Sequence, residues 1–162
     1  MDKKLDLRII KTYNKLTEAF GQMMKEVSFD EITVFDLCER ASVRRATFYK
    51  HFNDKYDFFR NIVISVMVSI DRKVGSRTKQ AMITDYITMF VKEVIVYFDA
   101  RPEILASILD SNAFPLIFDI ITHCTHESLK NHLDEATAAG ASYATDSDSL
   151  ASFLNGGIAT LL

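Results

Sequence analysis

Residues 32–55 read ITVFDLCERASVRRATFYKHFNDK, and they decide the fold of the N-terminal part of the chain. Thr33 stands three residues before Asp36, which is the spacing of a capping box that satisfies free backbone N–H groups at the start of a helix. Apolar side chains then recur at the helical period i, i+3, i+4, i+7, at Val34, Leu37, Cys38 and Ala41. We therefore expect a short helix that ends near residues 41–43.

A second short helix is expected to begin near Arg44, with Phe48 and Phe52, four residues apart, on its inward side. Two short helices joined by a tight turn are typical of a helix-turn-helix, whose second helix enters the major groove of DNA. The outward side of this second helix carries Arg44, Arg45, Thr47, Tyr49, Lys50 and His51. These side chains offer donors and acceptors for phosphates and base edges, so the pattern predicts DNA binding.

Helical periodicity extends on both sides of this stretch. Apolar residues at steps of three and four from Ile9 to Val27 predict a first helix with Asp6 as a possible cap. Asp54 is the expected cap of a long connecting helix over 54–74, followed by a change in composition after Gly75. Further helices are expected over 80–99, 102–111, 114–139 and 146–162. The fold class is therefore predicted as all-α, with a three-helix N-terminal unit over 1–52 and a helical domain over 53–162.

Composition excludes several classes of protein. Of 162 residues 48% are hydrophobic and only five are Gly and two Pro, which excludes intrinsic disorder and collagen-like chains. Two cysteines cannot form a disulfide framework or a four-cysteine zinc site. No long uncharged apolar stretch or signal peptide is recognised, so we expect a cytoplasmic protein without a membrane anchor.

Charge is distributed unevenly along the chain. The net charge is −3, but residues 1–60 hold 12 Lys and Arg against 10 Asp and Glu, while residues 61–162 hold 7 against 12. The acidity therefore belongs to the C-terminal part, and the mildly basic N-terminal part remains compatible with a DNA partner.

The run Thr47-Phe48-Tyr49-Lys50-His51-Phe52, followed by Asp54-Lys55 and preceded by the Ala41-Ser42-Val43 turn, resembles the TetR family of bacterial transcriptional regulators. The resemblance covers roughly residues 8–72, and beyond them only the helical layout agrees. It implies a ligand-responsive regulator, expected to be a repressor, that binds a palindromic DNA operator as a homodimer. It also implies a C-terminal bundle that holds a small-molecule effector and the dimer surface, and release from DNA when that effector binds.

The resemblance also implies roles for single residues. Thr33 and Lys55 match positions that contact phosphates, Arg44 and Arg45 match groove contacts, and Thr47, Tyr49 and His51 match phosphate or base contacts. Each position has a simpler alternative: Tyr49 and His51 as packing residues, Lys50 and Lys55 as solvated lysines. Ser42 replaces the glycine common in the turn, at an expected cost of about 1 kcal/mol if its backbone is left-handed.

In the C-terminal part, aromatic and thioether side chains are candidates for lining the effector pocket or, alternatively, for simple core packing. The expected ligand-binding residues are Met67, Phe90, Tyr97, Phe114, Phe118 and His123. His123, His126 and Glu127 suggest a metal site, but chance groupings of this kind are common on helices, and we expect neither metal nor cofactor. The apolar run over 146–162 stops without a cap, so we also expect that the native C-terminus extends further.

No catalytic motif is recognised, so we do not expect an enzyme. The main alternative is a protein that keeps this fold but acts through a protein partner such as a coactivator. The basic residues Arg44, Arg45 and Lys55 favour the DNA-binding interpretation. A small metal-dependent enzyme would depend entirely on the 123–127 cluster.

Overall fold

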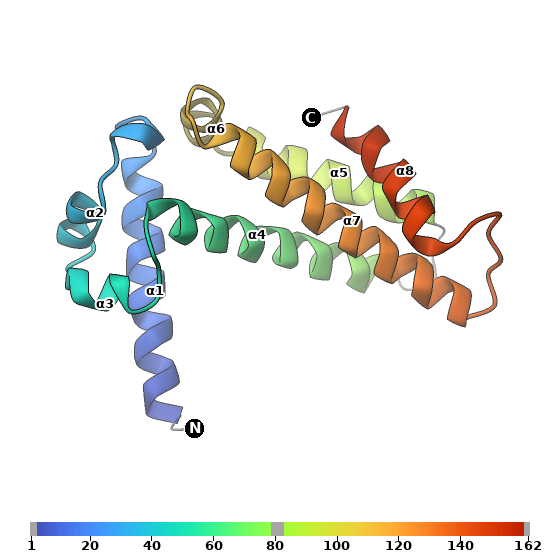
Figure 1. Cartoon of the computed structure of the whole chain (residues 1–162), viewed down its shortest axis with the longest axis horizontal. Helices are drawn as coiled ribbons and strands as arrows, with labels where there is room; N and C mark the ends of the chain where they lie inside the picture. Colours follow the sequence, from blue (N-terminus) through green and yellow to red (C-terminus); the bar gives the residue numbers. More distant parts are fainter. Residues whose placement is uncertain (1–2, 79–82, 161–162) are drawn as a thin grey trace. The chain divides into compact units, whose positions relative to one another are not determined.

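The computed structural model describes residues 3–78 and 83–160 (Figure 1). Every regular element in these residues is helical. The elements are α1 (Lys3–Met23), the short 3-10 helix η1 (Phe29–Glu31), α2 (Val34–Arg40), α3 (Arg45–Tyr49), α4 (Lys55–Thr78), α5 (Ile83–Asp99), α6 (Pro102–Leu109), α7 (Phe114–Ala138) and α8 (Ser147–Ala159). The all-α prediction, with an N-terminal helix-turn-helix followed by a helical C-terminal part, is confirmed.

The helices form two compact units. Unit 1 consists of Met1–Ile62 and Arg101–Pro115, and unit 2 consists of Val63–Ala100 and Leu116–Leu162. The chain therefore passes from one unit to the other within α4, and the segment that contains α6 belongs with the helix-turn-helix. The predicted boundary between an N-terminal unit over 1–52 and a helical domain over 53–162 stays a prediction.

Unit 1 has an aromatic core. Phe29, Phe48 and Phe58 are completely buried, and Leu16 and Phe20 of α1 pack among them. Neighbouring rings meet mostly in tilted or edge-to-face geometry, which suits the quadrupoles of aromatic rings; these rings are Tyr13, Phe20, Phe29, Phe48, Phe52, Phe58 and Phe59. This cluster joins α1, η1, α3 and the first turn of α4.

Unit 2 has a mainly aliphatic core between α4, α5, α7 and α8. Its buried side chains include Met67, Val74, Phe90, Val94, Leu129, Leu133, Ala151 and Ile158. Gly75 of α4 faces His132 of α7, where an added Cβ atom would lie 3.6 Å from the imidazole ring. His126 of α7 and Ser152 of α8 lie within hydrogen-bond distance, with Nε2 and Oγ 3.2 Å apart. Together these contacts pair α7 with α4 on one side and with α8 on another.

The structure corrects several predicted helix ends. α1 begins at Lys3, so Asp6 lies inside the helix instead of capping it, and α1 ends at Met23 rather than near Val27. α4 continues through Gly75 to Thr78, because one glycine costs only about 1 kcal/mol in a helix that tertiary packing supports. α6 ends at Leu109 rather than 111. The predicted helical residues 80–82 and 161–162 lie outside the described residues.

Within the described residues, no helix is by itself both long enough and apolar enough to cross a membrane. Pro102–Leu109 and Phe114–Ala138 pass that test only as a pair separated by a break.

Candidate nucleic-acid interface

The helix-turn-helix is built as its sequence predicts. The Thr33 side chain caps α2 by accepting a hydrogen bond from the Asp36 backbone N–H at 3.1 Å. Leu37 and Cys38 of α2 and Phe48 of α3 are fully buried, and α2 contacts both α1 and α3 (Figure 1). The buried residues hold the two short helices together and leave their opposite faces in solvent.

The turn between the two helices has left-handed backbone at Ser42, whose φ is 52°. Such a conformation favours glycine, because a Cβ atom crowds the backbone there. The expectation that Ser42 replaces a turn glycine at a conformational cost therefore applies to this turn. The Val43 backbone N–H closes the turn by donating to the Cys38 carbonyl at 2.9 Å.

Most of the predicted DNA-contacting residues lie exposed on this motif. Arg44 occupies the N-cap position of α3, but its side chain forms no capping hydrogen bond, because a guanidinium has no acceptor atom. The exposed members are Thr33, Arg44, Arg45, Tyr49, Lys50 and His51, whereas Thr47 is half-buried. The edge of the Phe48 ring packs against Tyr49, which nevertheless remains 56% exposed. The motif thus presents cationic and polar donors outward from a dry aromatic interior.

Lys55 differs from this group. Its ammonium donates to the carbonyl oxygens of Phe29, Asp30 and Ile32 at 3.0, 2.8 and 2.9 Å, and it also lies over the Phe29 ring, 4.8 Å from the centroid. Burial lowers the pKa of Lys55 from its ordinary value. An ammonium has three donors, and all three are used here to hold η1. The expected phosphate contact of Lys55 stays a prediction.

η1 is also tied to the segment that contains α6, within unit 1. The Phe29 backbone N–H donates to Ser107 Oγ at 2.9 Å. Both the backbone N–H and the side-chain amide of Asn112 donate to Asp30 Oδ2, at 3.2 and 2.9 Å. This junction was not predicted from the sequence. The Ser28-x-x-Glu31 spacing indicates only the start of η1, where it forms a capping box.

Phe35 is a further residue of the helix-turn-helix that was not predicted to have a role. It lies in the first turn of α2, remains 53% exposed, and has the Arg45 guanidinium carbon 5.4 Å from its ring centroid. The signal was present in the sequence as an aromatic residue on the polar side of the first motif helix.

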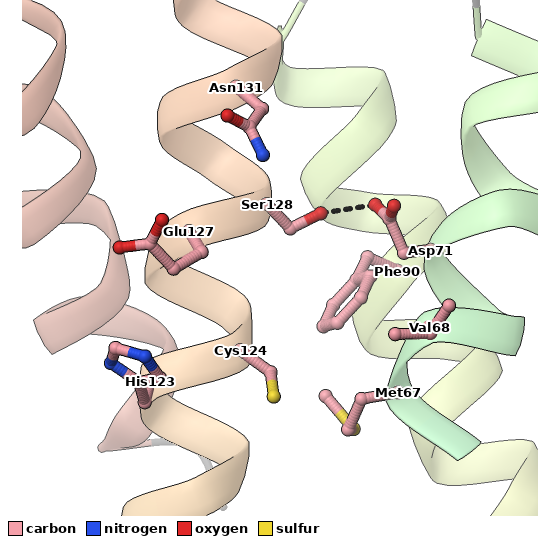
Figure 2. Close-up of a pocket in the computed structure, with 9 residues that line it drawn as sticks. All are labelled: Met67, Val68, Asp71, Phe90, His123, Cys124, Glu127, Ser128 and Asn131. Atoms are coloured by element: carbon pink, nitrogen blue, oxygen red, sulfur yellow. Dashed lines mark hydrogen bonds between the residues drawn. The ribbon is translucent and has the colours of Figure 1, made fainter. Parts of the chain in front are cut away.

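Unit 2 contains a cavity of about 270 Å³ between α4, α5 and α7 (Figure 2). Its lining residues are Met67, Val68, Asp71, Phe90, His123, Cys124, Glu127, Ser128 and Asn131. Figure 2 shows Cys124 and Ser128 directed from α7 toward Met67 and Asp71 on α4. The cavity therefore combines an apolar end with a carboxylate end.

A polar cluster of Asp71, Tyr86 and Ser128 lies beside this cavity, which Asp71 and Ser128 line. Tyr86 and Ser128 are buried, whereas the Asp71 side chain is 41% exposed. The Tyr86 hydroxyl donates to Asp71 Oδ1 at 2.7 Å and lies 2.6 Å from Ser128 Oγ. Ser128 also donates to the same carboxylate oxygen. Burial raises the pKa of the Tyr86 phenol well above its ordinary value. The His132 ring lies 3.9 Å from the Tyr86 ring, centroid to centroid, and covers the cluster from α7.

The structure gathers three of the predicted ligand-binding residues at this cavity: Met67, Phe90 and His123. The other three do not line it. Tyr97 packs edge-on against Phe98 in α5, Phe114 falls in unit 1, and Phe118 lies exposed on α7.

The suspected metal-binding histidines are not gathered into a site. His126 lies near Glu127 and Asp148, at 3.6 and 3.7 Å, while His123 lines the cavity. Within the described part of the chain, no group of three or more His, Cys, Asp or Glu side chains is placed to hold a metal ion.

Comparison with known proteins identifies the N-terminal part. Residues 18–62 match the model of bacterial regulatory proteins of the tetR family. The uncharacterized HTH-type transcriptional regulator YxbF of Bacillus subtilis (strain 168) is 30% identical over 63 residues, which are 38% of this chain. The match spans only 17% of the length of that relative.

Solved structures share the fold over most of the chain. The fatty acid degradation regulator FadR from Bacillus halodurans is similar with a TM-score of 0.61 and 18% identity, over 93% of this chain and 81% of FadR. The flavonoid-responsive regulator FrrA also gives a TM-score of 0.61, with 22% identity over 87% of this chain and 76% of FrrA. These identities establish the fold alone. Residues 18–62 are therefore similar to the bacterial regulatory proteins of the tetR family, and the proteins that this chain resembles are transcriptional regulators.

Proposed function

We propose that this chain is a DNA-binding transcriptional repressor that recognises a palindromic operator as a homodimer and is released by a small-molecule effector. One observation carries the proposal: the N-terminal end of α3 presents Arg44 and Arg45 to solvent while Phe48 anchors the helix in a fully buried core. A rigid helix with exposed guanidinium groups matches the requirement for reading base edges in the major groove.

A dimer follows from the size of the motif. One short recognition helix contacts only a few base pairs, so helix-turn-helix proteins gain affinity and specificity by pairing two half-sites about 34 Å apart. We therefore propose a twofold-symmetric operator. The place of action is the cytoplasm, where such an operator is accessible.

The effector site that we propose is the cavity lined by Met67, Asp71, Phe90 and Ser128. A ligand there changes operator affinity only if it binds the two conformations differently. The chain offers a covalent route for that coupling, because it leaves unit 2 after Ala100, passes through the Arg101–Pro115 segment in unit 1, and returns. Within unit 1, the hydrogen bonds from Asn112 to Asp30 connect that segment to η1, directly before α2.

The proposal is tested by selecting duplexes from a random library with the full chain and measuring affinity for the enriched sequence. We expect enrichment of an inverted repeat. Arg45→Ala should reduce discrimination between the selected duplex and a single-base variant by about 1–3 kcal/mol, the usual worth of a bidentate base contact. The matched control is Arg72→Ala, which removes an exposed arginine from α4 in unit 2 and should leave discrimination unchanged.

Two results would contradict the proposal. One is a selection that enriches no sequence at low and physiological salt. The other is an equal loss of affinity in Arg45→Ala and Arg72→Ala, which would indicate non-specific attraction of DNA to positive charge.

A further inference from the structure

We infer that Phe35 is a positioning residue for DNA recognition, whose ring holds the Arg45 guanidinium ready for a base edge. The inference rests on the proposed function. Phe35 belongs to α2 and Arg45 begins α3, so their contact crosses the helix-turn-helix. The guanidinium carbon lies 5.4 Å from the ring centroid, within the range of a cation–π contact.

This contact leaves the hydrogen-bonding capacity of Arg45 unused. The Phe35 ring attracts the guanidinium through its charge and offers no conventional hydrogen-bond acceptor. Among the described residues Arg45 forms no ion pair, in contrast to Arg40, whose guanidinium is 2.7 Å from Glu26. Arg45 is therefore held in place by an apolar partner that does not compete with a guanine for its N–H groups.

The exposure of Phe35 fits this role better than a role in the core. Leu37 and Cys38, on the same helix, are fully buried, whereas Phe35 is 53% exposed. Its removal therefore leaves little unfilled volume inside unit 1. Phe35 instead orders the long side chain of Arg45. An arginine that is already ordered loses less conformational entropy on binding.

The inference is tested with Phe35→Leu, which keeps an apolar side chain but removes the aromatic ring, and with Phe35→Tyr, which keeps the ring. Both are measured in the full chain, alone and combined with Arg45→Ala, on the selected duplex and on single-base variants. Phe35→Leu should weaken binding about three-fold and reduce base discrimination by a similar factor, as expected for an exposed cation–π contact. Phe35→Tyr should retain both.

Two further readouts separate positioning from other roles. In the Arg45→Ala background, Phe35→Leu should have no additional effect, because there is no guanidinium left to position. The salt dependence of binding should stay the same, because no phosphate contact is lost. Phe153→Leu, a substitution at an α8 residue that is 78% exposed, is the matched control and should change neither affinity nor discrimination.

The inference is overturned if Phe35→Leu retains full affinity and discrimination, or if it weakens binding equally with and without Arg45. Either result leaves the proposed function intact, provided that the unmodified chain binds its selected duplex. If the unmodified chain selects no sequence, the proposed function itself fails and the inference fails with it.

Discussion

The two units differ in where they place their polar groups. Unit 1 has a dry core of interlocked aromatic rings and directs Arg44, Arg45 and Lys50 outward. Unit 2 has a mainly aliphatic core that is interrupted by the partly buried Asp71–Tyr86–Ser128 cluster beside a cavity. Outward polar groups on a rigid core suit a large partner such as DNA, whereas inward polar groups beside a cavity suit a small ligand. The same helical fold thus supports two kinds of recognition.

The largest effect is expected from removing a central ring of unit 1. Phe48→Ala should lower the free energy of unfolding by about 3–5 kcal/mol, because Phe48 is completely buried among Phe52, Phe58 and Tyr49. Urea unfolding followed by far-UV circular dichroism measures this. Phe153→Ala, at an exposed position, should stay within about 0.5 kcal/mol of the parent chain. Similar losses in both variants would show that the aromatic core is not what stabilises unit 1.

The next largest effect is expected at Lys55. Lys55→Met keeps most of the aliphatic stem but removes the ammonium that donates to three backbone carbonyls, of which the Phe29 carbonyl keeps the Ile32 N–H as a donor. Stability should therefore fall by about 2 kcal/mol. Lys50→Met, at an exposed position, is the control for stability. The salt dependence of DNA binding should not change in Lys55→Met. A decrease of the slope by about one would instead reveal a direct phosphate contact.

In unit 2, the polar cluster is the feature to perturb. Tyr86→Phe removes the hydroxyl that bonds Asp71 and lies beside Ser128, and should lower stability by about 1 kcal/mol. Tyr143→Phe, in the loop before α8, should have no measurable effect. If Tyr86→Phe were more stable than the parent, the polar cluster would lower the stability of the fold and would be retained for ligand binding.

The raised pKa of Tyr86 also predicts how stability depends on pH. Because burial raises the pKa of Tyr86, the folded state keeps a proton that the unfolded chain loses near pH 10. Stability should therefore fall as the pH rises above about 10, and the fall should be shallower in Tyr86→Phe. Parallel pH profiles of the two proteins would contradict this assignment.

The smallest effect on stability is expected at Ser42, in the turn between α2 and α3, and this substitution should stabilise the protein. Ser42→Gly should raise stability by about 0.5 kcal/mol, because relief of the left-handed backbone outweighs the added freedom of the unfolded chain. Thermal unfolding against Ser111→Gly, where the buried serine donates to the Ile108 carbonyl, gives a control of opposite sign. A less stable Ser42→Gly would mean that the serine side chain supports the turn.

Local signals in the sequence were sufficient for the motif. The Thr33–Asp36 cap and the cap that the Asp54 side chain gives the Asp57 backbone N–H depend on neighbours within three residues. The buried positions Leu37 and Phe48 follow the helical period of their own short helices. Spacing alone therefore located α2, α3 and the start of α4.

Contacts between residues far apart along the chain could not be predicted from spacing. Lys55 meets carbonyls 23 to 26 residues earlier in the chain, and Asn112 meets Asp30 across 82 positions. Three of the six predicted ligand residues do not line the proposed effector cavity, because apolar periodicity does not tell which helix faces meet at a cavity. The connecting helix was predicted to end at residue 74 and ends at Thr78, since the packing of α4 against α7 was not visible in the sequence.

Hydrogen–deuterium exchange of the full chain, with and without the selected duplex, tests the central claim most directly, because it reports both units in one measurement. We expect exchange to slow most over residues 33–51, where α2, the Ser42 turn and α3 face the DNA, and to change less around the cavity between Met67 and Asn131, which reaches the DNA only through the proposed coupling. Protection around that cavity without protection of residues 33–51 would contradict the division of recognition between the two units.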